Sequence, residues 1–305
     1  MKKNISIKRY TTFKIGGKAK YFIKLRKKEK IKETVQEIKE KKLPFLIIGG
    51  GSNILADDKG YSGVILKIDN RELQVKDSKI FIGAGAPLSL AVGASLKNSL
   101  TGLEWASGIP GTVGGAIYGN AAAFGFSVKD CLESVDVFNI KKEKLETVSV
   151  SKCQYGNKES LFKKNKDLII VSAVFKLKKG RKEEIEKKMK ELISKRKKSH
   201  PNTLPSAGCI FKNYEGKILD KKIIEKFPEL EKFNKWGMIP VSYLIEKSNL
   251  KGKKVGGVKV SNKHANFIVN TDKGKKKDVL ELIKIIKKEV KKIFGIKIEE
   301  EVQKL

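Results

Sequence analysis

The spacing of apolar residues near the start of the chain predicts a helix, a strand and a turn, in that order. Ile31, Val35 and Ile38 recur at helical spacing within residues 28–42, so one face of a helix can be buried there. The apolar segment 43–49 that follows is typical of a short strand, and it runs directly into a group of glycines. A tight turn is therefore expected where that strand ends.

The middle of the chain continues to alternate between strand and helix patterns. Segments rich in β-branched and aromatic residues predict strands at 64–68, 79–85, 133–140 and 167–177. Helical spacing is seen over residues 87–100, with Gly102 as the expected end of that helix. A later helix is marked by Ile185, Met189 and Leu192. This alternation indicates a mixed α/β or α+β fold.

Two prolines within residues 200–205 interrupt that later helix and mark the best candidate for a domain boundary. Beyond it, residues 254–260 and 265–270 are typical of strands. A long helix with one apolar face follows, and Gly295 is expected to end it. Residues 296–302 alternate between apolar and polar side chains, which predicts a half-buried strand.

Composition indicates a folded and strongly basic protein. The chain has 305 residues, of which 40% are hydrophobic, so it can bury a sizeable core. The formal net charge is +33, and 62 of the 67 basic residues are lysines. These lysines are spread along the whole chain among glutamates, whereas a nucleic-acid surface typically gathers arginines and aromatics. We therefore expect long-range attraction for an acidic ligand and no specific nucleic-acid partner.

The sequence does not favour a metal site, a disulfide framework or a membrane span. The sequence has an odd number of cysteines, Cys131, Cys153 and Cys209, and none of them is in a CxxC motif. The only histidines that could complete a metal site with them are His200 and His264. The N-terminus lacks the apolar core of a signal peptide, and no apolar run reaches membrane-spanning length. The expected protein is cytoplasmic, soluble and without a membrane partner.

The first of two glycine-rich segments is GGGSN at residues 49–53, directly after an apolar strand. Glycines at such a place let backbone N–H groups approach a phosphate, so a diphosphate cradle is one interpretation. The GxGxxG spacing fails because position 54 is Ile54, and the Lys-Ser/Thr ending of a P-loop is absent. Taken alone, this segment is explained better by a plain tight turn.

The second segment, residues 108–125, holds six glycines, four alanines and the polar residues Thr112 and Asn120. A misplaced glycine costs about 0.5–1 kcal/mol relative to alanine, so a ligand lying against the loop is expected to compensate. Two such loops predict a dinucleotide held from two sides. Two tightly packed turns are the alternative.

Six sequence blocks carry a family resemblance. In chain order they are TTFKIGG at 11–17, IIGGGSNIL at 47–55, LEWASGIPGTVGGAIYGNAAAFG at 103–125, SAGCIFKN at 206–213, VGGVKVSNKHANFIVN at 255–270 and a terminal EEEV. Together they closely resemble the UDP-N-acetylenolpyruvoylglucosamine reductase (UDP-N-acetylmuramate dehydrogenase) family. Members are flavoenzymes that complete UDP-N-acetylmuramic acid in peptidoglycan synthesis.

This resemblance implies an α+β fold with a two-lobed FAD-binding domain of the vanillyl-alcohol-oxidase type and an α/β substrate-binding domain. The implied boundaries are residues 1–70 for the first lobe, 71–200 for the second lobe and 201–305 for the C-terminal domain. No histidine precedes His200, so the FAD is expected to be bound noncovalently. The implied cofactor-binding residues are Gly49, Gly50, Gly51, Ser52, Asn53, Gly108, Ile109, Gly111, Thr112, Gly114, Gly115 and Asn120.

The implied reaction passes hydride from NADPH, through FAD, to C3 of UDP-N-acetylglucosamine enolpyruvate. Charge then builds as an enolate on C2 and its carboxylate, which needs a stabilising cation and an acid. By resemblance the acid is Cys209, where serine is usual, and a thiol with an ordinary pKa of about 8.5 can donate that proton. Glu301 matches the assisting glutamate. Repulsion among residues 299–301 is expected to raise the pKa of an enclosed carboxyl.

The third catalytic position departs from the family pattern. Lys158 stands where an arginine is usual, and Asn157 replaces an aromatic residue. Lysine supplies positive charge but not the planar fork that fits a carboxylate. Arg196, Lys212 and Asn213 match positions that meet the substrate's diphosphate and carboxylate side.

Three functions are compatible with the sequence. The resemblance favours an FAD-dependent, NADPH-oxidising reductase. The altered pair at 157–158 leaves open a flavin oxidoreductase of the same fold with another acidic substrate. The net charge of +33 leaves open a catalytically weak, basic protein that binds polyanions.

Overall fold

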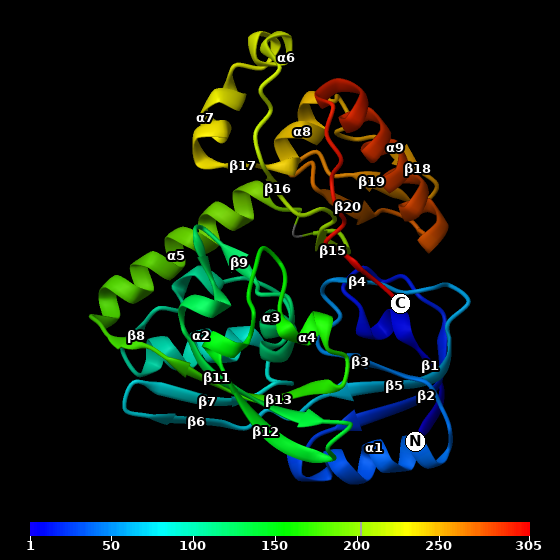
Figure 1. Ribbon diagram of the computed structural model, residues 1–305, viewed down its shortest axis with the longest axis vertical. Coiled ribbons are helices and arrows are strands. Elements are labelled where there is room, and N and C mark those ends of the chain that lie inside the picture. The colour runs from blue at the N-terminus through cyan, green and yellow to red at the C-terminus, as the bar shows by residue number, and fades with distance from the viewer. Residues whose placement is uncertain (202) are drawn as a thin grey trace. The chain divides into compact units, whose positions relative to one another are not determined.

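The computed structural model describes residues 1–201 and 203–305, and the contacts within it divide the chain into two units. Unit 1 comprises Met1–Ile5, Ala19–Gly51 and Tyr61–Arg196, and unit 2 comprises Ser6–Lys18, Ser52–Gly60 and Lys197–Leu305. Each unit contains both strands and helices (Figure 1). The expected α+β class is confirmed.

A four-stranded sheet lies in the N-terminal part of unit 1, in the order β1-β2-β5-β3 (Figure 1). Its strands are β1 (Lys2–Ser6), β2 (Lys18–Leu25), β3 (Phe45–Ile48) and β5 (Tyr61–Ile68). Both β2 and β3 run parallel to β5, so these three strands end at the same edge. Helix α1 (Ile31–Glu40) buries the three apolar residues that its spacing singled out.

A second, antiparallel sheet of unit 1 has the order β12-β11-β13-β7-β6. Its strands are β6 (Leu73–Lys76), β7 (Lys79–Gly83), β11 (Leu132–Asn139), β12 (Lys144–Ser149) and β13 (Leu168–Lys176). The α-helices that follow α1 in this unit are α2 (Leu88–Lys97), α3 (Val113–Tyr118), α4 (Leu161–Lys164) and α5 (Lys182–Ser199). Short strands pair as β8 (Leu100–Thr101) with β14 (Lys178–Lys179), and β9 (Ala122–Ala123) with β10 (Phe126–Ser127). One buried apolar cluster joins α1 and strands of both sheets to helices α2, α3, α4 and α5.

The predicted end of α2 is wrong. The helix stops at Lys97 and the chain enters β8 before it reaches Gly102. Ser99 adopts a left-handed conformation, with φ of 52°, and reverses the chain there. Glycine is preferred at such a position but is not required.

Unit 2 is built on an antiparallel sheet in the order β15-β20-β19-β18. Its strands are β15 (Ser206–Cys209), β18 (Lys254–Val255), β19 (Val258–Val260) and β20 (Phe267–Asn270). Its α-helices are α6 (Lys221–Lys226), α7 (Glu229–Trp236), α8 (Val241–Lys247) and α9 (Lys276–Phe294). Two further pairs join β16 (Tyr214–Glu215) to β17 (Met238–Ile239), and β21 (Gln303–Lys304) to β4 (Ile54–Leu55). Within residues 1–201 and 203–305, 3-10 turns lie at Ile7–Tyr10, Lys28–Lys30, Glu104–Ala106, Val128–Asp130 and Val150–Lys152.

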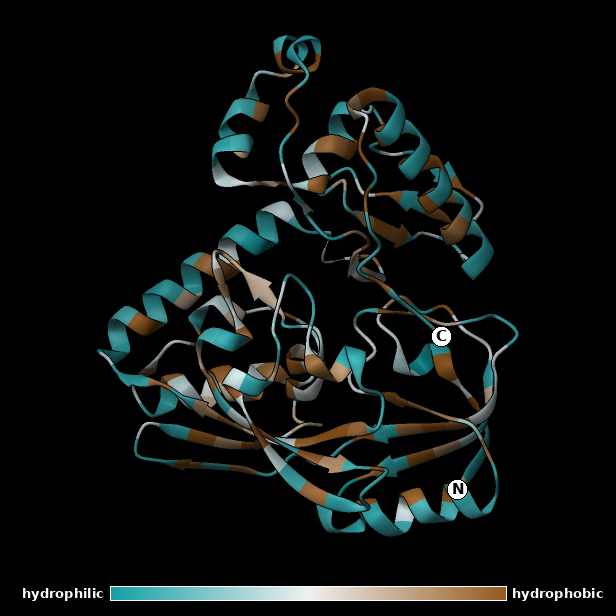
Figure 2. Cartoon of the chain, in the orientation of Figure 1, coloured by the Kyte–Doolittle hydropathy of each residue, from teal (hydrophilic) through white to brown (hydrophobic). Residues whose placement is uncertain are grey.

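Helix α9 confirms the amphipathic pattern, because apolar and charged positions alternate along its length (Figure 2). Gly295 adopts a φ of 71° and ends the helix as expected. Two nearby predictions need correction. Residues 254–260 form a hairpin that turns at Gly256 and Gly257 rather than one strand. Residues 296–302 alternate in burial but form no continuous strand, because only Glu300 makes a bridge, to Phe211.

The core of unit 2 draws in segments from the N-terminal part of the sequence. Phe13, Ile15 and Leu55 are fully buried together with apolar residues from Ala207 to Val302. The implied domain boundaries at residues 70 and 200 stay a prediction. No helix within the described ranges is long and apolar enough to cross a membrane.

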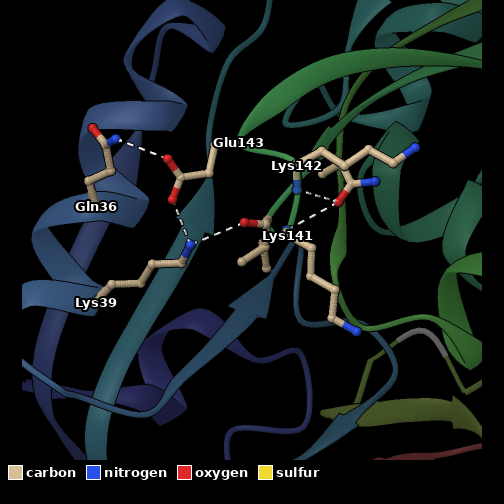
Figure 3. A network of polar contacts seen from close by, with 7 residues as sticks. Gln36, Lys39, Lys141, Lys142 and Glu143 are labelled. Carbon is tan, nitrogen blue, oxygen red and sulfur yellow. Dashed lines mark hydrogen bonds and ion pairs between the residues drawn. The ribbon is translucent and has the colours of Figure 1, made fainter.

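Polar side chains tie α1 to the turn between β11 and β12 within unit 1 (Figure 3). Lys39 Nζ lies 2.8 Å from Glu143 Oε1 and donates to Ile140 O at 3.1 Å, while Gln36 Nε2 donates to Glu143 Oε2 at 3.3 Å. The hydrogen bond from Lys39 is the main cause that lowers the pKa of Glu143. Such exposed pairs stabilise little, so this contact chiefly fixes where the turn lies.

Candidate active site and cofactor loops

The two glycine-rich loops pack directly against each other in unit 1. A Cβ atom on Gly50 would lie 2.8 Å from Gly111 Cα, and one on Gly49 would lie 2.4 Å from Thr112 Oγ1. Atoms cannot approach this closely without movement, so glycine alone permits the contact. Packing therefore explains part of the glycine content, and the same packing brings both loop backbones to one place.

Polar groups on these loops lack hydrogen-bond partners among the described residues, and such groups are what a bound dinucleotide would need. Within residues 1–201 and 203–305, the N–H groups of Gly50 and Gly111 make no hydrogen bond to the chain. Ser107 Oγ, directly before the second loop, is buried without a partner among the described residues. Such groups are costly to bury, and loop N–H groups suit diphosphate oxygens. The residues present fit a noncovalently bound FAD.

Other predicted cofactor residues hold the loop itself. Thr112 Oγ1 accepts from Gly115 N at 3.3 Å and caps α3. A Cβ on Gly114 would lie 2.9 Å from Ala84 Cβ. The side chain of Asn120 donates to Gly156 O at 3.0 Å and accepts from Lys129 N at 3.4 Å. Their contacts with the cofactor, and those of Gly51, Ser52, Gly108 and Ile109, stay predictions.

The close approach at Gly50 leads to a prediction. We expect Gly50→Ala to push the loops apart, cost about 1–3 kcal/mol of unfolding free energy and weaken FAD binding by more than about tenfold. Gly93→Ala is the matched control, because Gly93 lies in α2 with no atom within 4 Å of the added Cβ. Gly93→Ala is expected to retain FAD, and its free energy of unfolding should rise by up to about 1 kcal/mol. Flavin absorbance after gel filtration and urea unfolding measure both effects, and parent-like FAD retention in Gly50→Ala would contradict the argument.

Cys209 ends strand β15 in unit 2, where it pairs with Phe267 of β20. The register shifts between Ser206 and Cys209, and Gly208 takes a φ of 78°. A bulge with a left-handed glycine redirects the side chain that follows. Cys209 is partly exposed, whereas Cys131 and Cys153 lie in the core, as expected. Burial raises the pKa of Cys131 to about 12 and also raises that of Cys153, so neither is suited to donate a proton at neutral pH.

The segment with Glu301 runs beside the Cys209 segment within unit 2. Glu301 N donates to Ile210 O at 2.7 Å, and Phe211 bridges Glu300. Asn53 Nδ2 donates to Glu301 O at 3.2 Å. The structure thus brings together residues of three motifs that are far apart in the sequence.

The expectation that repulsion raises the pKa of an enclosed carboxyl in this segment is wrong for Glu300, whose side chain is 16% exposed. Glu300 contacts Lys287 Nζ at 2.5 Å and Lys304 Nζ at 2.6 Å. Burial raises the pKa of Glu300, but the hydrogen bonds from these two lysines outweigh burial and hold the pKa below its ordinary value. Basic side chains from α9 and β21 therefore neutralise the carboxylate.

Lys158 lies in a strained turn of unit 1 with φ of 57°, a left-handed conformation that is unfavourable for a residue with a Cβ. The ammonium of Lys163 donates to the Lys158 carbonyl. Ser160 Oγ donates to Tyr118 O at 2.7 Å, and Asn120 holds the Gly156 carbonyl. The turn is thereby fixed against the end of α3, at the second glycine loop.

Arg196 of α5 reaches the same loop. Its Nε donates to Ser107 O at 3.3 Å, and its guanidinium carbon lies 5.5 Å from the centre of the Phe124 ring, which is cation–π geometry. Phe124 is 43% exposed with φ of 55°. The sequence reasoning missed this residue. Its signal was an aromatic side chain at the end of a run of alanines.

The remaining predicted substrate residues lie in unit 2. Lys212 Nζ is 3.4 Å from Glu299 Oε2, and the Lys212 side chain is 17% exposed while that of Glu299 is 78% exposed. Asn213 Oδ1 accepts from Val241 N at 3.3 Å. Asn213 therefore also supports the start of α8.

Comparison with known proteins assigns both parts of the chain. An FAD binding domain matches residues 19–149, and the C-terminal domain of UDP-N-acetylenolpyruvoylglucosamine reductase matches residues 200–305. The reductase of Caldanaerobacter subterraneus is 37% identical over 301 residues, which cover 98% of this chain and 92% of that protein. The chain belongs to the UDP-N-acetylenolpyruvoylglucosamine reductase family.

Other members of the family match over the same length. The reductase of Clostridium novyi is 35% identical over 304 residues, covering 99% of this chain and 91% of that protein. The crystal structure of the Thermus caldophilus reductase has a TM-score of 0.78 at 31% identity and covers 99% of this chain and 98% of its own. The resemblance seen in the sequence is confirmed. The chain is an FAD-dependent oxidoreductase of peptidoglycan synthesis, in a family whose reductant is NADPH.

Proposed function

We propose that this chain reduces UDP-N-acetylglucosamine enolpyruvate to UDP-N-acetylmuramate, with Cys209 as the proton donor to C2 of the enolpyruvyl group. The bulge at Gly208 carries the proposal, because it redirects a partly exposed thiol within a segment that also neighbours Glu301. We also propose a cytoplasmic location, where the nucleotide substrates occur.

Bound FAD supplies the hydride chemistry that links NADPH to C3 of the substrate. The residues of this chain handle the charge and the proton that follow. As C2 becomes carbanion-like, the S–H bond of Cys209 breaks, a C–H bond forms at C2, and the thiolate regains its proton from water. The carboxyl group of Glu301 assists at the same carbon.

Positive side chains stabilise the enolate and bind the acidic substrate. In this proposal Lys158 supplies the ammonium that stabilises the negative charge developing on the enolate and its carboxylate. Arg196, Lys212 and Asn213 bind the diphosphate and carboxylate side. The pair between Lys212 and the mostly exposed Glu299 is weak, so a substrate anion can replace that partner.

A direct assay tests the function. Purified protein is expected to oxidise NADPH quickly only when the enolpyruvyl sugar nucleotide is present, with one UDP-N-acetylmuramate formed per NADPH consumed. Equal NADPH oxidation with and without this substrate would reject the proposal and favour another acidic substrate. Binding to polyanions is the test of the third function. If that binding is lost between low and physiological salt and shows no sequence preference, the net charge causes nonspecific attraction and is not part of the function.

A further inference from the structure

Lys67 is a charged residue in an otherwise apolar stretch of β5, the strand that lies between β2 and β3. Its Cα partners are Lys24 on β2 and Ile48 on β3, and its side chain is partly buried. Burial lowers the pKa of Lys67, Arg71 and Lys24 lower it further, and Asp69 opposes them. Keeping an ammonium here is therefore costly.

The Lys67 ammonium donates to the carbonyl oxygen of Gly49 at 2.9 Å. Gly49 begins the first cofactor loop, and its peptide bond to Gly50 is trans. In a trans peptide the C=O and the following N–H point in opposite directions. Holding the Gly49 carbonyl towards Lys67 thus turns the Gly50 N–H outward, and this N–H has no acceptor within the described ranges.

A purely structural role does not explain the charge. A neutral donor would satisfy one carbonyl without the cost of burying an ammonium. An ammonium also polarises the peptide and keeps two further N–H donors. Both properties strengthen the binding of an anion that accepts a hydrogen bond from the Gly50 N–H.

We propose that Lys67 is a cofactor-positioning residue, which orients the Gly49–Gly50 peptide towards the FAD diphosphate and places positive charge behind it. This inference rests on FAD binding and is independent of the catalytic roles of Cys209 and Lys158.

Holoenzyme variants test the proposal through FAD affinity. Diluting each holoenzyme and measuring the fluorescence of released FAD gives its dissociation constant. Lys67→Met is expected to weaken FAD binding by about 10- to 100-fold, the worth of one charge-assisted hydrogen bond. Lys67→Arg keeps the charge and is expected to stay within about threefold of the parent. Lys24→Met, on the neighbouring strand, is the control and should match the parent.

The pH dependence gives a second readout. A diphosphate favours the charged form of Lys67, so FAD affinity of the parent should fall as pH rises from 7 to about 10. Lys67→Arg should remove this fall, since arginine stays charged. The facing groups are Lys24 on β2 and Asp69 and Arg71 after β5. Comparing the pH profile of Lys24→Met with that of the parent shows how much Lys24 contributes to the fall in affinity.

Thermal unfolding separates positioning from structure. Without FAD, Lys67→Met should unfold at nearly the parental temperature. Added FAD should raise its unfolding temperature by less than it raises that of the parent. The proposal is overturned if Lys67→Met binds FAD as tightly as the parent does. It is also overturned if the variant has a lower unfolding temperature without FAD but is stabilised by added FAD as much as the parent. A parent protein that binds no FAD would contradict this inference and the proposed function together.

Discussion

Replacing Cys209 with alanine is expected to slow substrate reduction by about 100- to 10,000-fold, the scale of a general acid. The flavin absorbance should still bleach with NADPH at nearly the parental rate, because that event needs no proton on C2. Its return on mixing with the enolpyruvyl substrate should be the slow phase. Stopped-flow absorbance measures both rates in one protein.

Two further variants distinguish chemistry from packing. Cys209→Ser should retain much of the rate, since serine is the usual residue in the family and also carries a proton. Cys131→Ala removes a thiol from the core of unit 1 and should lower the free energy of unfolding without separating the two kinetic phases. An equal loss of both phases in Cys209→Ala would assign Cys209 a packing role at the bulge.

Local pattern was sufficient for elements whose apolar face is continuous. The spacing of Ile31, Val35 and Ile38 predicted α1, and the stripe along α9 predicted that helix together with its end at Gly295. The hairpin at Gly256 and Gly257 was also readable in principle, because paired glycines inside an apolar run commonly mark a turn.

Long-range contacts were not readable from local pattern. Nothing near Phe13 or Leu55 indicates that they share a core with residues beyond 206. The approach of Gly50 to Gly111 is likewise a tertiary contact, so the sequence could favour two loops acting together without showing that they touch.

The site shows the same division between motif and context. The resemblance singled out Cys209, and its preceding glycine was a visible sign of the bulge. The lysines that neutralise Glu300 come from Lys287 and Lys304, which local repulsion arguments do not include. Lys67 was missed because it is one of 62 lysines, and only its place within an apolar strand sets it apart.

Lys158→Gly is expected to move stability and activity in opposite directions. Glycine adopts the left-handed conformation without strain, so the free energy of unfolding should rise by about 1 kcal/mol. The same change removes the charge proposed to face the enolate. The substrate-dependent return of flavin absorbance should then slow by about 100-fold, while bleaching by NADPH stays parental. Urea unfolding and stopped-flow absorbance check the two halves.

Lys273→Gly is the control for the backbone, because Lys273 is a lysine that also has a left-handed φ, of 47°, although it is exposed and Lys158 is partly buried. It should gain similar stability with unchanged kinetics, which isolates the effect of the backbone. Lys158→Arg restores the planar fork usual in the family and should hold or improve the rate. If Lys158→Gly matches the parent in both kinetic phases, Lys158 has no catalytic role. Arg196 then becomes the cation to test, because its guanidinium already lies on the second glycine loop through Ser107.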